Sequence, residues 1–141
     1  MKKLRLYTDS DVIISSLISQ SGAASFIFSL KNINFFASNY SKKETKIVAE
    51  RLGLKEGKVN ELFGKKLEVV LLEDDLEKIK EKFADCVTDK NDAHIVAGAV
   101  KAKAQFLISY NLRHYKADKI KTDFGMLLMT PAMFLQYLRS K

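Results

Sequence analysis

Short apolar runs alternate along the chain with longer stretches in which apolar residues recur every three or four positions. The runs are rich in β-branched and aromatic residues, as buried strands are, and the longer stretches have the spacing of one buried helix face. We predict strands at residues 3–8, 33–37, 67–72, 106–109 and 126–129. We predict helices at residues 11–19, 22–30, 41–52, 55–63, 76–83 and 92–103, and a last helix from residue 131.

Residues that start or stop helices fall at several of these boundaries. Ser41 and Glu44 have the Ser-x-x-Glu spacing of a capping box, and Gly53 would end the same helix. Thr130 followed by Pro131 would start the last helix, with Thr130 as its N-cap. The chain has neither an internal repeat nor a linker, so we expect residues 1–141 to form a single domain.

Strands that alternate with helices predict an α/β fold, in which helices cover both faces of a parallel sheet. Such sheets bind ligands beyond the carboxyl ends of their strands. Asp9 and Asp11 follow the first predicted strand, and Asn111 follows the fourth. Asp92 begins the helix that leads into the fourth strand. We therefore expect a site of acidic side chains at this edge of the sheet.

These acids could also have ordinary structural roles. Asp9 could cap the first helix, and an acid such as Asp11 suits a first helical turn. Glu44 could be only the capping-box partner of Ser41, or it could pair with a nearby lysine on the surface. The residue types alone therefore leave the chemical role open.

The segment TDKNDAHIVAGAV combines two acids with a helix of small residues. Asp89 or Asn91 could cap the helix that Asp92 begins, and one acid is then not needed for capping. We expect that acid to point toward the edge of the sheet. His94, inside the helix, is predicted to be a surface or structural residue. His114 lies near the expected cleft and could either be structural or contact phosphate or water.

Carboxylates that converge require a counter-charge. Two of them about 4 Å apart repel by roughly 4 kcal/mol at an effective dielectric constant of about 20. Protonation of one acid would relieve the repulsion, and so would a hard divalent cation such as Mg²⁺ or Mn²⁺, which prefers oxygen ligands. Such an ion can activate water and stabilise the charge that develops on a phosphate. The chain has no His and Cys set with the spacing of a zinc site.

The composition favours a polyanionic partner. The net charge is +7, from 24 basic and 17 acidic residues, although lysine-rich surfaces are common in proteins without such a partner. The single cysteine, Cys86, excludes an intrachain disulfide and fits a reducing compartment. No apolar stretch reaches the roughly 18 residues of a membrane span, and Asp9 comes too early for a signal peptide. We therefore expect a cytoplasmic protein that does not enter a membrane.

Four segments together resemble the PIN-domain family, and the resemblance covers nearly the whole chain. LYTDSDVIISSL is similar to that family's first strand, catalytic acid and apolar helix, and SNYSKKETKIVAERL is similar to the segment with its conserved Glu. VTDKNDAHIVAGAVKAKAQFLISYNLRHY is similar to the third segment, in which an acid at a helix start precedes a strand and a polar turn. MLLMTPAMFLQYL is similar to the closing strand, Thr-Pro turn and final helix. Each motif is weak alone, and their order and spacing carry the resemblance.

The resemblance implies a three-layer α/β fold whose central parallel sheet has the strand order 3-2-1-4-5. It implies that Asp9, Glu44 and Asp92 are catalytic and bind Mg²⁺ or Mn²⁺. It also implies a ribonuclease, because metal-activated water hydrolyses RNA phosphodiesters in that family. Many relatives are VapC-like toxins that form homodimers and are held inactive by a cognate antitoxin protein.

Two positions depart from the family pattern. Asp11 stands where members often have Asn, and Asn111 stands where many have a fourth Asp. Asn111 can offer a carbonyl oxygen but no charge, so we expect a weaker second metal position or one-metal chemistry. Asn111, Asp11 and Asp89 are further candidate metal ligands. Ser10 and Ser109 could bond a ligand carboxylate or a metal-bound water, or could simply form turns.

Basic side chains flank the candidate acids. Arg113 and Lys116 follow the fourth predicted strand, and Lys42 and Lys43 precede the candidate Glu. These four side chains could contact an RNA backbone, or they could belong to a solvated lysine face.

Aromatic residues offer two further hypotheses. Tyr110 and Phe124 could stack on unpaired bases or could belong to the core. Phe26, Ile27 and Phe28 could form an exposed apolar side that serves as a homodimer interface, and a core position fits them equally well.

Three other functions fit part of the pattern. A haloacid-dehalogenase-like phosphatase also has an Asp-x-Asp pair, matched by Asp9 and Asp11, but position 13 is Ile rather than Thr or Val and no Gly-Asp motif follows. A receiver domain needs an Asp after the third strand and a Lys after the fifth, where this chain has Glu73 and Thr130-Pro131. A PIN fold without catalysis, which binds RNA or protein, is the main alternative because the fourth acid is missing. Unused clustered carboxylates would, however, lower the stability of such a module.

Overall fold

The computed structural model describes residues 3–141 and places a parallel sheet at the centre of the protein. Within these residues, five strands follow the order β3-β2-β1-β4-β5. The strands are β1 (Leu4–Thr8), β2 (Ile33–Ser38), β3 (Leu67–Val70), β4 (Phe106–Ile108) and β5 (Leu127–Met129). The order and the parallel direction confirm the predicted α/β fold.

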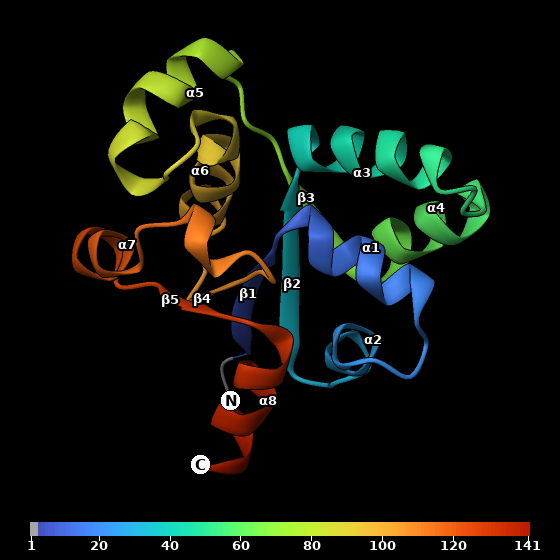
Figure 1. The fold of residues 1–141 in the computed structure, drawn as a ribbon. Helices are drawn as coiled ribbons and strands as arrows, with labels where there is room; N and C mark the ends of the chain where they lie inside the picture. Colours follow the sequence, from blue (N-terminus) through green and yellow to red (C-terminus); the bar gives the residue numbers. More distant parts are fainter. Residues whose placement is uncertain (1–2) are drawn as a thin grey trace.

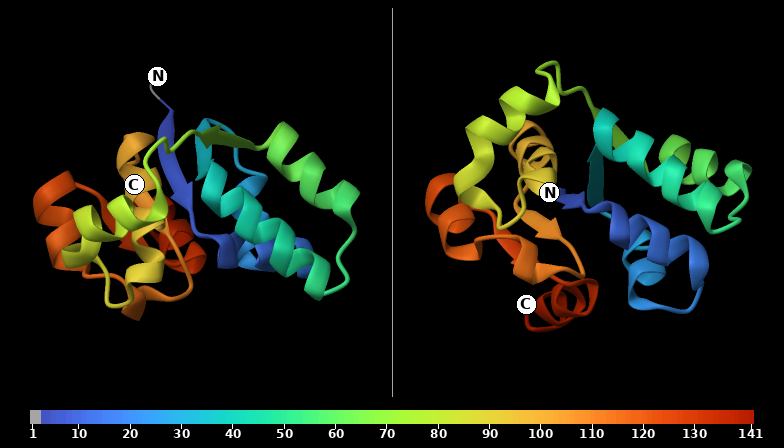
Figure 2. Two further views of the ribbon diagram at one scale, coloured as in Figure 1. Left: turned by 90° about the horizontal axis from the view of Figure 1, so that it is seen from above. Right: turned by 45° about the horizontal axis from the view of Figure 1, so that its top comes forward.

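Helices cover both faces of this sheet and give the fold three layers (Figure 1). One face is covered by α1 (Ser10–Ile18), α2 (Ala23–Phe28), α3 (Asn39–Arg51), α4 (Glu56–Lys65) and α8 (Pro131–Arg139). The other is covered by α5 (Leu76–Phe83), α6 (Ala93–Lys101) and α7 (Ala117–Phe124). The further views in Figure 2 show the same two helix groups on either side of the strands.

The central strand β1 separates two hydrophobic cores. Successive side chains of a strand point to opposite faces, so Leu6 enters the core under α1 and α2 while Tyr7 enters the core under α6. Both side chains are fully buried. Tyr7 lies beside Phe36 of β2 in the parallel register, and Thr8 lies beside Ile108 of β4. Because β1 is buried on both faces, the residue that follows it is held in a fixed place.

The start of α3 differs from the prediction. The helix begins at Asn39, and its N-cap is Ser38, whose hydroxyl accepts a hydrogen bond from the Ser41 backbone N–H at 3.1 Å. The predicted capping box of Ser41 and Glu44 is therefore wrong, and Glu44 is free of any capping role. The physical reason is that Ser38 ends β2 and provides the same hydroxyl three residues earlier. The predicted Thr130 cap of α8 is confirmed, with Met133 N–H bonded at 3.1 Å.

Gly98 allows α6 to pack closely on β1. A Cβ atom at this position would lie 2.7 Å from the ring atoms Cε2 and Cζ of Tyr7, which is closer than real side chains approach. The small residues predicted to form one helix therefore have a packing role. They let the helix that follows Asp92 rest directly on the central strand.

Helix α7 lies in a segment for which the sequence predicted no element. Ile120 is its buried residue, and Gly125 ends it with a left-handed backbone, φ 67°. A single buried position in a run of charged residues gives too weak a periodicity to reveal an eight-residue helix. The helix is stabilised by its packing against β5 and the turn at Ala84–Cys86.

The proposed apolar side of α2 is only partly exposed. Phe26 is 54% exposed, whereas Ile27 and Phe28 are buried in the core. The prediction of a three-residue apolar surface is therefore wrong, because a helix turns neighbouring side chains by about 100° and two of the three face the sheet. No helix within residues 3–141 is by itself long and apolar enough to cross a membrane, although the bent pair of α1 and α2 meets that test of length and composition when taken together.

Candidate active site

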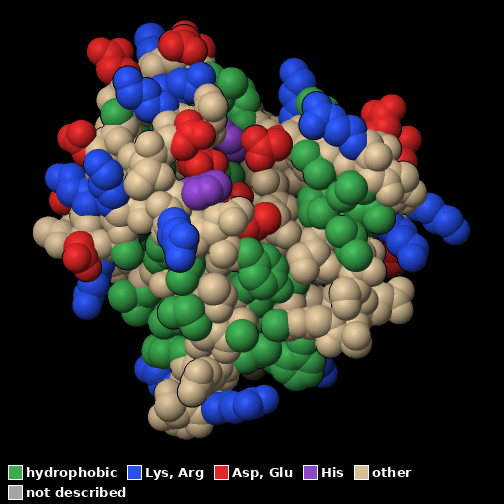
Figure 3. All heavy atoms as spheres, viewed as in Figure 1, with side chains coloured by type: hydrophobic (Ala, Val, Ile, Leu, Met, Phe, Trp, Pro, Cys, Tyr) green, Lys and Arg blue, Asp and Glu red, His purple; other side chains and the backbone are tan. Residues whose placement is uncertain are grey.

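Acidic side chains gather at the carboxyl edge of the sheet, where the two helix groups meet (Figure 3). In this view they lie around the histidine side chains, and one basic side chain adjoins a histidine while most others lie nearer the outline of the molecule. The edge is built from the ends of β1 and β4 and from the N-terminal parts of α1, α3 and α6. This is where an open parallel sheet is expected to bind a ligand.

Asp9 is the buried centre of the site, with only 7% of its surface exposed. Its backbone N–H donates to the Ile108 carbonyl at 2.9 Å, which ties the end of β1 to β4. Its carboxylate accepts hydrogen bonds from Ser10 N–H at 2.7 Å, from the Ser109 hydroxyl at 2.9 Å and from the Tyr115 hydroxyl at 2.6 Å. Asp9 is also the N-cap of α1. The capping and site roles therefore coincide in one residue.

The Tyr115 hydroxyl keeps its proton in this environment. Burial, followed by the charge of Asp9, raises the pKa of Tyr115. A protonated hydroxyl can donate to the carboxylate, whereas a phenolate would repel it. Tyr115 was not among the predicted site residues.

Glu44 reaches the same edge from α3. Its Oε1 accepts a hydrogen bond from the Ser10 hydroxyl at 2.7 Å, and its Oε2 lies 3.3 Å from His94 Nε2. The hydrogen bond from His94 is the main reason that the pKa of Glu44 lies below its usual value, and partial burial works in the opposite direction. Glu44 is therefore ionised at neutral pH. Ser10 connects it to Asp9, since the Ser10 backbone N–H bonds Asp9.

Asp92 arrives from the turn before α6. Its Oδ2 lies 3.2 Å from His114 Nδ1, and burial followed by the charge of Asp9 raises its pKa. Asp89 instead accepts a hydrogen bond from Asn91 N–H at 2.9 Å and caps the turn Lys90–Asp92. Of the two predicted caps, Asp89 is the one that caps, although it caps the turn before α6 and not α6 itself, and the Asp92 side chain makes no capping bond.

Asp11 and Asn111 bond each other at the side of the site. The Asn111 side-chain N–H donates to Asp11 Oδ2 at 2.9 Å, and Tyr110 N–H donates to the same oxygen at 3.0 Å. Asn111 thus acts as a donor to Asp11 and does not present its oxygen to the acids. Burial and the nearby charge of Asp9 raise the pKa of Asp11 to about 7. Asp11 Oδ1 is buried without a hydrogen-bond partner.

The donor set fits a hard divalent cation. The available groups are carboxylates, and one of them, Asp11, has a buried oxygen without a hydrogen-bond partner. Burial, followed by the charge of Asp9, raises the pKa of both Asp11 and Asp92. A cation among them would remove this repulsion. Asp9, Glu44 and Asp92 could hold it, with Asp11 as a fourth oxygen donor. Among residues 3–141, no three His, Cys, Asp or Glu side chains converge closely enough in this arrangement to enclose an ion.

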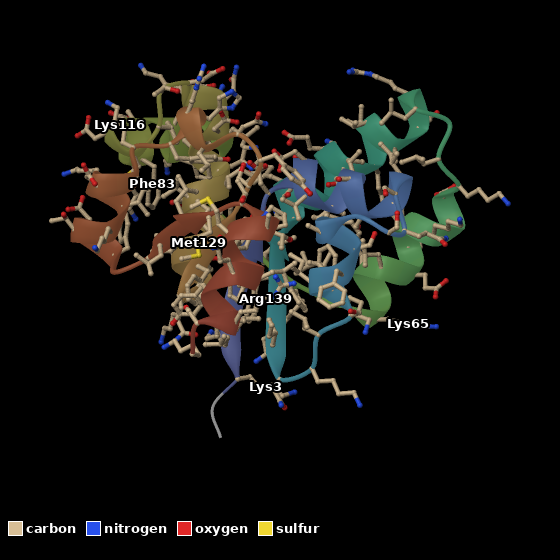
Figure 4. All side chains as sticks on the ribbon, turned by 60° about the horizontal axis from the view of Figure 1, so that its bottom comes forward. Lys3, Lys65, Phe83, Lys116, Met129 and Arg139 are labelled. Carbon is tan, nitrogen blue, oxygen red and sulfur yellow. The ribbon has the colours of Figure 1, made fainter. Side chains whose placement is uncertain are left out.

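The flanking residues divide into two groups. Arg113, Lys116 and Lys43 are exposed, whereas Lys42 directs its ammonium over the Phe63 ring at 5.7 Å. Figure 4 shows Lys116 on the same side of the sheet as α7. Of the four predicted basic residues, Arg113, Lys116 and Lys43 are therefore accessible to a ligand, whereas the Lys42 ammonium already contacts an aromatic ring.

The two aromatic residues that could stack on bases, Tyr110 and Phe124, lie in different parts of the structure. Tyr110 is exposed, and its backbone N–H bonds Asp11 directly. Phe124 lies at the end of α7 and packs beside Phe83 of α5, with ring centroids 6.1 Å apart. Tyr110 therefore adjoins the acids, and Phe124 belongs to the neighbouring helix pair.

The two histidines both lie beside candidate acids. His94 is buried and contacts Glu44, so of the two alternatives predicted for it the surface position is wrong, and a structural role is not tested. The position of His114 near the cleft is confirmed by its contact with Asp92.

Comparison with known proteins places the chain in a family. The chain matches the family described as PIN domain over residues 5–113, so it belongs to the PIN-domain family. That range includes Asp9, Glu44, Asp92 and Asn111. A search of curated protein sequences found no match.

A solved structure has the same fold. The structure of VapBC-1 from nontypeable Haemophilus influenzae aligns with a TM-score of 0.59 and 18% sequence identity, over 92% of this chain and 99% of that chain. At this identity the likeness concerns the fold. Because 92% of the chain is covered, the likeness in fold extends beyond residue 113.

Proposed function

We propose that this protein is a metal-dependent endoribonuclease that hydrolyses RNA phosphodiesters at the edge formed by Asp9, Glu44 and Asp92. The observation that carries the proposal is that Glu44 and Asp92, from distant parts of the chain, lie at the same sheet edge as the buried Asp9: Ser10 joins Glu44 to Asp9, and the charge of Asp9 acts on Asp92. Membership of the PIN-domain family supports it. Bound Mg²⁺ or Mn²⁺ would activate water and neutralise the charge that develops on the phosphate.

The chain's own residues prepare this chemistry. Ser10, Ser109 and Tyr115 fix the Asp9 carboxyl group through hydrogen bonds, and a group held in this way needs little reorganisation when a cation binds. Arg113, Lys116 and Lys43 are free to contact an RNA backbone, and Tyr110 is placed to stack on an unpaired base. Ser10 and Ser109 would act on the ligand carboxylates and not on the ion itself.

We further propose that the protein is the toxin component of a toxin–antitoxin pair that acts in the cytoplasm as a homodimer. The support is the fold shared with VapBC-1 and the family resemblance. A cognate antitoxin would then be its protein partner. Because a bound antitoxin would hold the ribonuclease inactive, RNA cleavage has to be measured on protein that is free of antitoxin.

The second candidate is a PIN fold without catalysis that binds RNA or protein. The observation that favours it is Asn111, whose side-chain N–H is engaged by Asp11 where a fourth carboxylate would add charge. A binding module would retain the basic surface but would not need the hydrogen bonds that fix Asp9.

The test is cleavage of an unstructured RNA with Mg²⁺, with Mn²⁺ and with chelator, by wild type and by Asp9→Asn. We expect metal-dependent cleavage by the wild type and a loss of about a hundredfold or more in the variant, because the central charged ligand is gone. Exposed Asp74, changed to Asn, provides a matched control that should cleave normally. Absence of cleavage by antitoxin-free wild type would favour the binding module, and cleavage unaffected by Asp9→Asn would contradict this site.

A further inference from the structure

The side chain of Glu44, a candidate metal ligand, is not held in place by its own helix, α3. Its side chain is long and 46% exposed on α3, where it could adopt many conformations. Two residues from other helices restrain it. Ser10 of α1 donates to Oε1 at 2.7 Å, and His94 of α6 lies 3.3 Å from Oε2.

His94 has the features of a fixed support. Only 7% of its surface is exposed, and the Tyr40 ring of α3 lies tilted beside it at 6.3 Å between centroids. Its Nδ1 is buried without a hydrogen-bond partner, so Glu44 is the residue that its polar atoms contact. Because Nε2 faces a carboxylate, the proton of the neutral ring belongs on Nε2. The imidazole therefore donates to Glu44 from a rigid position.

We infer that His94 is a positioning residue that holds the Glu44 carboxylate for metal binding at the proposed nuclease site. It acts through Glu44 and contacts neither ion nor RNA. The inference rests on the proposed function, since it assigns a role within the same site. The partners that orient metal ligands typically change metal affinity by about 10- to 100-fold when they are removed.

A competing explanation is that the contact only ties α3 to α6. These helices pack against each other, and a hydrogen bond between them would add stability to that packing. A purely structural contact would alter the free energy of unfolding without a specific effect on metal affinity. A positioning contact would alter metal affinity in folded protein, and only while Glu44 is present.

The experiment measures Mn²⁺ binding to the full chain by the electron paramagnetic resonance signal of free Mn²⁺. His94→Gln places an N–H donor near the position of Nε2, whereas His94→Asn is a shorter amide that does not reach Glu44. We expect Kd for Mn²⁺ to rise about tenfold in His94→Asn and to stay within about twofold of wild type in His94→Gln. Thr45→Val, which removes a buried hydroxyl from α3 beside Glu44, should leave Kd unchanged.

A double-mutant cycle tests whether His94 acts through Glu44. Glu44→Gln alone should weaken binding, and adding His94→Asn to it should cause no further loss. Urea unfolding of each variant establishes that the binding measurements refer to folded protein.

The outcomes separate the two proposals. Wild type that binds no Mn²⁺ would contradict the proposed function, and the role of His94 would fall with it. If both His94 variants bind Mn²⁺ with the same Kd as wild type, His94 has no positioning role, and the nuclease proposal is unaffected. Equal weakening in the Gln and Asn variants, or further loss in the double variant, would also overturn the role of His94.

Discussion

At the scale of single residues, the site is defined as much by hydrogen-bond donors as by acids. Asp9 accepts from two hydroxyls and a backbone N–H, and Glu44 accepts from Ser10 and His94. Asp9 and Asp92 could be predicted because one follows a strand and the other begins a helix, and Glu44 could be predicted from the family resemblance. Ser10 and Ser109 were predicted as possible partners of the carboxylates, whereas nothing local marks Tyr115 or His94 as a partner.

Tyr115→Phe should destabilise the protein by removing one donor from a buried carboxylate. The hydrogen bond is 2.6 Å long and leads to a charged group, so we expect a loss of about 1.5–3 kcal/mol at pH 7. Urea unfolding without divalent cation measures it. Tyr110→Phe is the matched control, because it removes the same hydroxyl group from an exposed tyrosine. It should change the free energy of unfolding by less than about 0.5 kcal/mol. Equal effects in the two variants would show that the contact with Asp9 contributes nothing.

Cys86 should react slowly with iodoacetamide in the native protein. The thiol is buried, and burial followed by the charge of Asp123 raises its pKa, so little thiolate is present at pH 8. In the unfolded chain the pKa returns to its ordinary value and the reaction should be much faster. Because the pKa of Cys86 is raised in the folded protein, its neutral thiol contributes fully to stability below the pKa that the thiol has in the unfolded chain. That contribution is lost as pH rises through the higher pKa of the folded protein. Rapid alkylation of native protein, followed by mass spectrometry, would contradict the buried position.

At the scale of elements, the alternation of strands and helices was predictable, and most boundaries lie within a few residues of those expected. The exceptions have physical causes. The start of α3 was misplaced because Ser38 and Ser41 are both good N-caps, and the end of β2 decides between them. Helix α7 was missed because only Ile120 marks its buried face.

Gly98→Ala should test the close packing of α6 on β1. The added Cβ would meet the Tyr7 ring at 2.7 Å, and a buried ring on the central strand cannot move away easily. We expect a loss of about 1–3 kcal/mol in urea unfolding. Gly64→Ala in α4 is the matched control, because its Cβ would meet nothing within 4 Å. That variant should gain about 0.5–1 kcal/mol from the higher helix propensity of alanine, and a gain in both would contradict the packing.

At the scale of the whole molecule, strand order determines the site. Because β1 lies between β2 and β4, the residues after β1 meet the turn after β4, and Ser109 and Tyr110 contact Asp9 and Asp11. The net charge of +7 is distributed over a surface that includes both edges of the sheet. Charge alone therefore cannot say which edge meets a nucleic acid.

Paired lysine and arginine variants should locate the RNA surface. Lys43→Ala with Arg113→Ala removes two charges beside the acids, and Lys31→Ala with Lys66→Ala removes two from a groove at the opposite edge of the sheet. Without divalent cation, the first pair should weaken RNA binding and reduce the slope of log K against log salt by about 1.4, since each phosphate contact with a single strand contributes about 0.7. The second pair should leave the slope unchanged. The reverse result would move the RNA surface to the other edge.

The sequence by itself determined the fold class, because hydrophobic periodicity is a property of the linear chain. Asp9 and Asp92 could be selected as candidates from their places after a strand and at a helix start, and Glu44 from the family resemblance of its segment. Only the tertiary structure decided which side chains hold those acids. His94, Tyr115 and Ser109 reach them from 50 to 106 positions away, through a strand order and a helix packing that no local pattern records. The tertiary structure also decided that the Asn111 side chain donates a hydrogen bond to Asp11, so that its N–H and not its carbonyl oxygen faces that acid.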